Sequence, residues 1–330
     1  TMLHLLAGID PWPLGVAPFE PAFRESFTVA AAGLGFTRLK AGVEFLPIVA
    51  GHLGADAIAG IVALGLSRRP GLSLFIDLGT NGEIALVGAG EAVGCSCAAG
   101  PAFEGGHISS GMAALPGAVR RVDEEEDGRL RLDVIGGGVA RGLCGSGLTD
   151  ITALLLARGA ISPRGQMAAP SALPATAPPY VSDGLRCGDS GVRFVLSEDV
   201  VPAVALTAHD VREVQLAKAA VRTGIDVLLE ERGLLPEQVN DVFLAGAFGS
   251  SIRPDSLLAL GMLPPQLRGR IRPVGNVAGM GAKLALAYEE RIDEARRLAR
   301  TMRHIELMSR SDFQDRFAAN IAFPAPEAAS

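Results

Sequence analysis

The chain contains 330 residues, of which 48% are hydrophobic, 20% are charged and 5% are aromatic, and its formal net charge is −6. This is enough apolar material for one large or two medium domains. The acidic balance, without a basic patch that contains aromatic residues, argues against nucleic-acid binding. No apolar run reaches the roughly 18–20 residues of a membrane span, and the start does not resemble a signal peptide, so we expect a cytoplasmic protein without a membrane partner.

Two further features of the composition bear on the class of protein. The chain begins with Thr1 followed by Met2, so we interpret it as a segment of a longer polypeptide. Its 41 glycines indicate many tight turns, as in α/β proteins that bind phosphates. Only Cys95 and Cys97 form a close pair of cysteines, whereas structural zinc sites commonly use two such pairs. We therefore interpret the four cysteines, which also include Cys144 and Cys187, as buried reduced thiols.

The first 100 residues predict loops, a helix and a β-hairpin. Proline-containing segments at 10–13 and 17–21 are expected to be extended loops, and a helix is predicted at 52–66. Two β-rich runs within residues 72–87 flank Asn81-Gly82, a pair that tolerates positive φ and predicts a tight hairpin turn. A third strand is predicted at 92–97.

The rest of the chain alternates between strands and helices. A helix at 209–232 is predicted to begin with a capping box formed by Thr207 and Asp210. This mixture of hairpins and crossover helices is typical of ribonuclease-H-like lobes rather than of a pure Rossmann sheet. The other predicted elements are a hairpin of 119–122 with 130–135, a helix at 148–158, a Pro/Ala-rich loop at 163–179, strands at 242–245 and 271–274, a helix from Asn276 to about Tyr288, and a frayed tail at 323–330.

The hairpin segment 77–82, Asp-Leu-Gly-Thr-Asn-Gly, carries the strongest chemical signal. Backbone N–H groups of a glycine-containing turn and the Thr80 hydroxyl can donate hydrogen bonds to phosphates. Mg²⁺ is commonly anchored by one or two carboxylates, and Asp77 would supply one. A plain hairpin in which Asp77 caps its own turn is an equally good interpretation.

Three other segments carry weaker signals. The strand before Gly246-Ala247-Phe248-Gly249 enters a turn where a base or ribose could approach the backbone, although an ordinary strand-to-helix turn has the same pattern. The segment 142–147, Gly-Leu-Cys-Gly-Ser-Gly, precedes a helix whose N–H groups suit a phosphate or ribose hydroxyl. Gln215, Lys218 and Arg222 share one face of the long helix, which alone would indicate a solvated stripe.

A carboxylate that accepts a proton from an attacking water is also needed for phosphate hydrolysis. Glu104 or Glu83 could supply it if either lies near the cleft. For Glu104, a helical turn that packs on the sheet is at least as good an interpretation.

The order of these segments resembles the second lobe of the actin, sugar-kinase and heat-shock-chaperone superfamily. More narrowly, the sequence resembles the ATP-dependent reductive activators of corrinoid proteins over nearly its whole length. The segments that carry this resemblance are 1–6, 14–19, 76–84, 95–106, 142–148, 215–219 and 274–279.

The resemblance implies an α/β fold with ribonuclease-H-like lobes, in which residues 1–70 are the remnant of a truncated first lobe and residues 71–330 form the nucleotide-binding second lobe. It implies that Asp77 binds Mg²⁺ and contributes to catalysis. Glu104, from the requirement for a proton acceptor given above, is the second catalytic candidate. The residues that the resemblance assigns to ATP are Asp77, Gly79, Thr80, Asn81 and Gly82 at the phosphates, Gly145, Ser146 and Gly147 near ribose, Gln215 and Lys218 on the nucleoside side, and Gly246, Ala247 and Gly249 beside the base.

The resemblance also implies a function for the longer protein. ATP hydrolysis would remodel a corrinoid protein of a methyltransferase system so that its Co(II) is reduced to Co(I). The electron would come from a plant-type [2Fe–2S] ferredoxin domain ahead of residue 1, and a homodimer is compatible with the family. Two alternatives stay open, namely a kinase for a small acid or sugar and a non-catalytic, nucleotide-dependent binding module.

Overall fold

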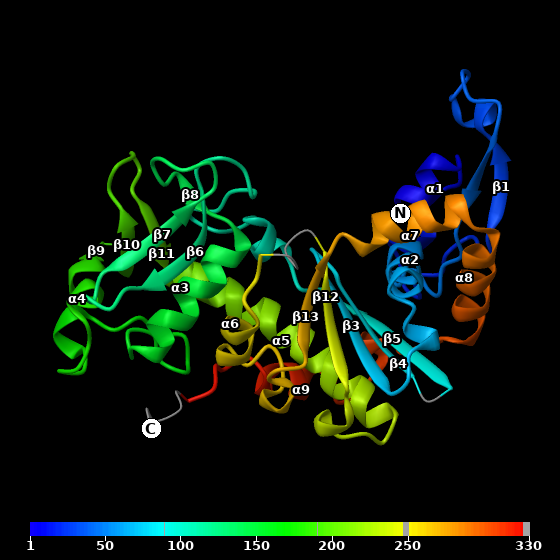
Figure 1. The fold of residues 1–330 in the computed structure, drawn as a ribbon. Helices are drawn as coiled ribbons and strands as arrows, with labels where there is room; N and C mark the ends of the chain where they lie inside the picture. The colour runs from blue at the N-terminus through cyan, green and yellow to red at the C-terminus, as the bar shows by residue number, and fades with distance from the viewer. Residues whose placement is uncertain (89, 190, 247–250, 326–330) are drawn as a thin grey trace.

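A six-stranded sheet forms the centre of the molecule (Figure 1). The computed structural model describes residues 1–88, 90–189, 191–246 and 251–325. The strand order is β13-β12-β3-β4-β5-β14. Strands β3, β4 and β5 form an antiparallel meander, and β12 and β13 continue the sheet parallel to β3. This is the ribonuclease-H-like arrangement predicted from the sequence. The strands are β3 (Leu72–Leu78), β4 (Gly82–Gly88), β5 (Glu91–Cys97), β12 (Asp241–Ala245), β13 (Ile271–Gly275) and β14 (Arg303–His304).

Helices cover both faces of this sheet because side chains alternate along its strands. On β3, Leu74 and Ile76 belong to the core beneath α5, whereas Phe75 belongs to the core beneath α2. Helices α7 and α8 pack beside α2, and α9 packs against α5. The bounds are α2 (Ala55–Leu64), α5 (Ala208–Glu231), α7 (Val277–Ala287), α8 (Glu289–Thr301) and α9 (Phe313–Ala319).

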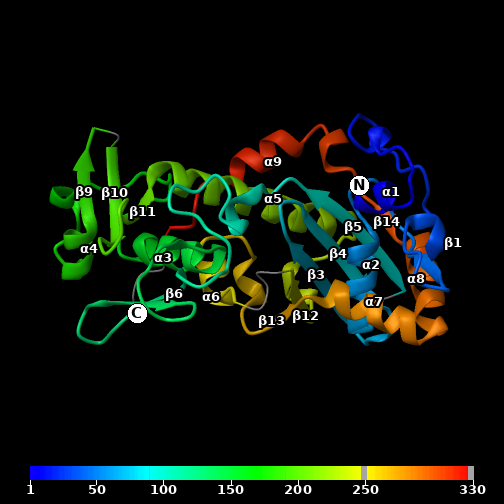
Figure 2. The same cartoon turned by 90° about the horizontal axis from the view of Figure 1, so that it is seen from above.

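A second lobe is inserted between β5 and α5, and α5 runs from this lobe to the central sheet (Figure 2). It contains two three-stranded sheets, ordered β7-β6-β8 and β11-β10-β9. Its elements are β6 (Ala118–Glu124), β7 (Leu130–Val134), β8 (Gly142–Leu143), α3 (Gly145–Ala157), α4 (Pro179–Gly184), β9 (Leu185–Gly188), β10 (Gly191–Ser197) and β11 (Val204–Thr207). Helix α6 (Pro254–Ala259) of the sheet lobe joins it through the Ser256 hydroxyl, which donates to Asp150 of α3 at 2.7 Å.

The first 50 residues form a small unit beside the sheet, with α1 (Met2–Leu6) and an antiparallel pair, β1 (Phe27–Ala30) and β2 (Gly42–Phe45). The Phe27 and Phe45 rings stack with their centroids 4.7 Å apart. Helix α2, by contrast, belongs to the core of the sheet, so this part of the first 70 residues packs with the rest of the chain. Short 3-10 turns occur at Trp12–Leu14, Ala31–Leu34, Leu66–Arg68, Pro101–Glu104, Pro170–Ala172, Pro236–Gln238, Pro265–Leu267 and Leu307–Ser309.

The predicted hairpin is confirmed, but its turn consists of residues 79–81 and not of Asn81-Gly82. Gly82 is the first residue of β4 and pairs with Leu78, so the connecting residues are 79–81. The capping box of α5 is confirmed, since the Thr207 hydroxyl accepts from the Asp210 amide and the Asp210 carboxylate accepts from the Thr207 amide. Asn276 caps α7 as predicted by accepting from the Gly279 amide at 2.8 Å.

Helix α3 begins at Gly145, three residues before the predicted start. Its glycines allow very close packing. A Cβ atom at Gly145 would lie 2.1 Å from the Phe103 carbonyl oxygen, and one at Gly147 would lie 2.2 Å from the Val119 carbonyl oxygen. The low helix propensity of glycine is therefore overridden by tertiary contacts that a larger residue would prevent.

Replacing Gly145 with Ala is expected to lower the free energy of unfolding by about 2 kcal/mol, because the added methyl group must displace backbone atoms. Gly188→Ala is the matched control, since a Cβ atom there meets nothing within 4 Å. Urea denaturation of the two variants and the wild type measures the difference. Equal stability of the two variants would contradict the packing argument.

Several other expectations were wrong. Phe323 is 3% exposed and donates its amide to the Pro163 carbonyl at 2.8 Å, so it does not begin a frayed tail; residues 326–330 lie outside the described part. Cys187 is exposed, whereas Cys95, Cys97 and Cys144 are buried as predicted.

Within the described ranges, no helix is both long and apolar enough to span a bilayer.

Candidate functional site

Three parallel strands end at one edge of the central sheet, and each leads into a glycine. Gly79 follows β3, Gly246 follows β12, and Gly275 is the last residue of β13. The Gly246 amide donates to the Gly275 carbonyl at 3.2 Å, which joins two of these ends directly. In open α/β sheets, ligands bind outside the carboxyl ends of parallel strands. This edge is therefore the candidate functional site.

Gly246 and Asp77 lie side by side at this edge. Their strands pair in register, with Ala245 opposite Asp77. Gly246 has a φ of 99°, and a Cβ atom there would lie 2.8 Å from Asp77 Oδ1 and 2.5 Å from the Leu78 carbonyl oxygen. Only glycine fits this position without strain. Two predicted site residues far apart in sequence are thus neighbours, while Ala247 and Gly249 lie outside the described residues.

Asp77 and Glu83 face each other across the hairpin, on the side of the sheet covered by α2. Burial, with a smaller contribution from Asp56, raises the pKa of Asp77 to about 6. Burial, Asp56 and Asp77 together raise the pKa of Glu83 to about 9. At neutral pH, Glu83 is therefore protonated and Asp77 is mostly ionised. Only Asp77 of this pair is then available as an anionic metal ligand.

Asp56, in the first turn of α2, is a third carboxylate near this edge. It was not among the site residues predicted from the sequence, although an acidic residue soon after Gly54 at the start of an apolar helix was a visible signal. Its electrostatic effect on Asp77 and Glu83 shows that the N-terminal end of α2 approaches the candidate site.

The turn after β3 is held by Glu104, the last residue of the 3-10 turn Pro101–Glu104. Glu104 accepts one hydrogen bond from the Thr80 amide and one from the Thr80 hydroxyl, each at 3.0 Å. Thr80, Asn81 and Glu104 are all exposed. The structure thus brings Glu104 to the predicted phosphate turn, and its carboxylate already occupies both donors of Thr80.

Gly145, Ser146 and Gly147 are buried at the start of α3. The Ser146 hydroxyl donates to the Arg120 carbonyl at 2.8 Å, and the two glycines lie against the backbone carbonyls of Phe103 and Val119. These contacts give all three residues a structural role. Their predicted contact with ribose stays a prediction.

Gln215 and Lys218 are each 2% exposed, so the interpretation of a solvated stripe was wrong for both. Lys218 Nζ donates to the Ala322 carbonyl at 2.6 Å, and burial, reinforced by Arg222, lowers the pKa of Lys218 to about 8. Within the described part of the chain, Gln215 Nε2 has no hydrogen-bond partner. The C-terminal segment that covers Lys218 separates it from solvent, and a contact of these side chains with a nucleoside stays a prediction.

The residues at this edge are suited to a hydrated magnesium ion with few protein ligands. They are less suited to a metal ion that is ligated by protein groups alone. Among the described residues, no group of three or more His, Cys, Asp and Glu side chains is arranged to hold a metal. Mg²⁺ usually keeps several waters and binds through one or two carboxylates together with substrate phosphates. The Asp77 carboxylate beside Gly246 satisfies this modest requirement.

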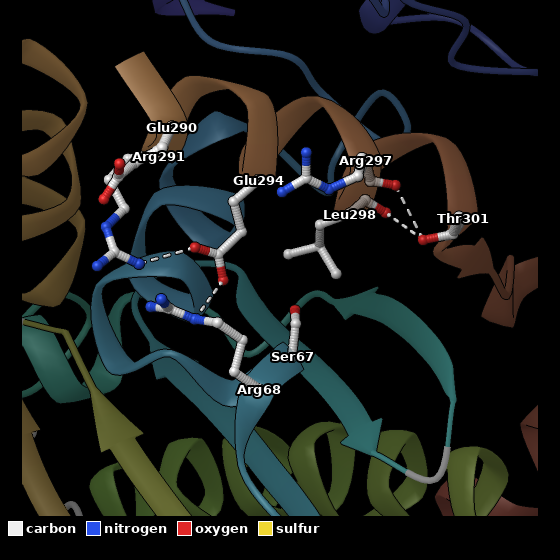
Figure 3. Close-up of a pocket in the computed structure, with 8 residues that line it drawn as sticks. All are labelled: Ser67, Arg68, Glu290, Arg291, Glu294, Arg297, Leu298 and Thr301. Atoms are coloured by element: carbon white, nitrogen blue, oxygen red, sulfur yellow. Dashed lines mark hydrogen bonds and ion pairs between the residues drawn. The ribbon is translucent and has the colours of Figure 1, made fainter. Parts of the chain in front are cut away.

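A pocket of about 330 Å³ lies between the segment after α2 and helix α8 (Figure 3). Its buried Glu294 pairs with Arg68 at 3.3 Å and with Arg291 at 2.9 Å, so the carboxylate at its centre already has two arginine partners. Arg68 comes shortly before β3 begins, whereas Asp77 lies near the other end of that strand. This pocket therefore does not belong to the candidate site.

Comparison with known families agrees with the fold. Residues 71–329 match a family model described as the C-terminal domain of RACo, the ASKHA domain, and residues 1–69 match one described as the RACo middle region. The chain therefore contains an ASKHA domain, the fold of actin, sugar kinases and heat-shock chaperones. More specifically, it belongs to the family of reductive activators of corrinoid proteins.

Individual relatives support this assignment. The chain is 34% identical over 329 residues to the corrinoid activation enzyme RamQ of Eubacterium limosum, covering 98% of the chain and 54% of the relative. It is 26% identical over 301 residues to a [Co(II) methylated amine-specific corrinoid protein] reductase of Methanosarcina barkeri, covering 84% and 51%. A solved reductive activator for corrinoid, iron-sulfur protein superposes with a TM-score of 0.87 at 32% identity, covering 99% of this chain and 51% of that one. The chain spans about half the length of these relatives.

Proposed function

We propose that this chain is the nucleotide-binding part of an enzyme that uses ATP to reactivate a corrinoid protein of a methyltransferase system. The observation that carries the proposal is the position of Asp77 beside Gly246, where the parallel strands β3 and β12 end. This edge offers a carboxylate for Mg²⁺, a turn with phosphate donors and, at Gly246, a bend of the backbone where the parallel strand β12 ends.

In the proposed complex, Asp77 holds Mg²⁺, and the phosphates lie against the turn formed by Gly79, Thr80 and Asn81 and against Gly82, the first residue of β4. The base lies against the turn that begins at Gly246. Bound Mg²⁺ would neutralise charge that develops on the phosphates during hydrolysis. In this proposal, Glu104 accepts a proton from the attacking water after its carboxylate leaves Thr80, to which it is hydrogen-bonded in the structure.

The proposed role of this domain is conformational. ATP favours the state of the protein that it binds more tightly, and its hydrolysis releases that state. In the proposed reaction, one electron from a [2Fe–2S] cluster elsewhere in the full-length protein reduces Co(II) of the bound corrinoid to Co(I). The cluster supplies the redox chemistry, and the ASKHA domain controls access to the corrinoid.

The direct test uses the full-length protein, its corrinoid partner in the Co(II) state and a low-potential reductant. We expect the absorbance of Co(I) to appear only with Mg·ATP, together with release of phosphate. Restoration of Co(I) at the same rate without ATP would contradict the proposal. A phosphorylated small molecule in place of free phosphate would identify a kinase instead.

A further inference from the structure

Thr80 is held to the turn Pro101–Glu104 from both ends. The Thr80 carbonyl accepts from the Gly100 amide at 2.9 Å, just before this turn, and its amide and hydroxyl both donate to Glu104 at the end of it. A single residue of the proposed phosphate turn is thus fixed by three hydrogen bonds to one neighbouring segment.

The Glu104 carboxylate uses the donors that a phosphate would need. A carboxylate and a phosphate both present anionic oxygens, and both accept charge-assisted hydrogen bonds from backbone amides and hydroxyls. Since one amide hydrogen cannot serve two strong acceptors fully, binding of a phosphate at Thr80 requires Glu104 to leave. From this geometry, and on the basis of the proposed function, we infer that Glu104 is an internal competitor that occupies the phosphate position of the turn in the nucleotide-free protein.

The same contact connects the turn to the inserted lobe. Phe103, next to Glu104, is fully buried, and its carbonyl oxygen packs against Gly145 at the start of α3. The Gly100 contact with the Thr80 carbonyl does not involve the donors of Thr80, so it can persist when Glu104 leaves. Nucleotide binding would therefore release the end of the 3-10 turn that faces α3 while its beginning stays attached to Thr80. Phosphate binding at the turn is in this way coupled to the inserted lobe.

Two variants of the full-length protein separate the contact from the charge. Glu104→Ala removes the competitor, and we expect it to bind Mg·ATP about 10- to 100-fold more tightly than the wild type, because loss of a charge-assisted hydrogen bond is typically of this size. Glu104→Gln removes the charge but keeps an oxygen acceptor for the Thr80 amide. We expect it to tighten binding by less than half as much. Isothermal titration at constant salt measures all three affinities.

The outcomes distinguish this inference from the proposed function. Equal tightening by Glu104→Ala and Glu104→Gln would show that only a general charge effect operates, and unchanged or weaker binding by Glu104→Ala would also overturn the inference. Absence of Mg·ATP binding by the wild type and both variants would instead refute the proposed function. Amide hydrogen exchange adds a readout without nucleotide, since the Thr80 amide should exchange faster in Glu104→Ala than in the wild type. Equal exchange would overturn the inference even where ATP binds.

Discussion

Replacing Asp77 with Asn in the full-length protein should weaken Mg·ATP binding on the order of 100-fold, because removing a charged partner costs about 3 kcal/mol and each 1.4 kcal/mol is tenfold. Asn keeps the size of the side chain beside Gly246 and removes only the anionic oxygen. Asp255→Asn is the matched control, because Asp255 is highly exposed on α6 and, among the residues that the structure describes, pairs with Arg268 alone. Isothermal titration with Mg·ATP measures both variants.

The assignment of Asp77 to the metal also predicts that the affinity for Mg·ATP depends on pH. Mg²⁺ requires the ionised carboxylate, and the pKa of Asp77 is raised to about 6, so protons compete with the metal below this value. The wild-type affinity for Mg·ATP should therefore rise about tenfold between pH 5 and pH 7.5, in proportion to the ionised fraction. Asp77→Asn retains only the titration of the nucleotide itself, which serves as the baseline. Wild-type and Asp77→Asn profiles of the same shape would contradict the assignment of Asp77 to the metal.

Replacing Glu83 with Gln should stabilise the fold. The folded pKa of Glu83 is raised to about 9, above the value of 4.5 in the unfolded chain, so the stability that Glu83 contributes is full below pH 4.5 and is lost as the pH rises toward 9. At pH 7, which is 2.5 units above 4.5, ionisation of Glu83 in the unfolded chain lowers the free energy of unfolding by about 3 kcal/mol. Gln cannot ionise, so the Glu83→Gln variant should recover this amount. Gln has nearly the same shape as the protonated carboxyl group that the folded protein prefers.

Urea denaturation at pH 5, 7 and 8.5 tests this prediction. The gain in the free energy of unfolding should be small at pH 5 and should increase with pH. Glu237→Gln, an exposed position on the surface, is the control and should change stability by less than about 0.5 kcal/mol. A gain for Glu83→Gln that does not depend on pH would show that burial does not raise the pKa of this group.

The pH dependence has a functional consequence. This edge of the sheet carries a carboxylic acid that stays neutral at pH 7 beside one that ionises, because their pKa values are separated to about 9 and about 6. Perturbed carboxyl groups of this kind are frequent at functional sites. Glu83→Gln is therefore expected to preserve Mg·ATP binding, in contrast to Asp77→Asn.

Local chemistry accounts for the elements that sequence could predict. The two β-rich runs within 72–87, the capping box at Thr207 and the Asn276 cap depend on residues within a few positions of one another. The ribonuclease-H-like arrangement followed from the order of these elements, although the edge strand β14 was not predicted. The exact position of the turn could not be predicted in this way, because pairing of Gly82 with Leu78 extends the strand into the pair of residues expected to form the turn.

Long-range contacts account for what could not be predicted. The proximity of Asp56 to Asp77 depends on how α2 packs on the sheet, and the contact of Glu104 with Thr80 joins residues 24 positions apart. The burial of Lys218 depends on Ala322, 104 positions later. From sequence alone, a polar residue on a helix face is predicted to be exposed to solvent when the segment that covers it lies far along the chain.

The glycines of α3 illustrate a related difficulty. A sequence rich in glycine before a helix predicts a loop, and phosphate-binding loops share that composition. Here Gly145 and Gly147 lie inside the helix. Both positions require glycine because the carbonyl groups of Phe103 and Val119 leave no space for a Cβ atom. Composition alone cannot separate a glycine that admits a ligand from one that admits a neighbouring backbone.

The central claim is that Mg·ATP binds where β3 and β12 end, and a structure of the full-length protein with Mg²⁺ and a non-hydrolysable ATP analogue tests it most directly. We predict metal density at the Asp77 carboxylate, phosphates against the Thr80 turn with Glu104 displaced, and the base near Gly246. A nucleotide bound elsewhere, with Glu104 still hydrogen-bonded to Thr80 and no metal at Asp77, would contradict the account.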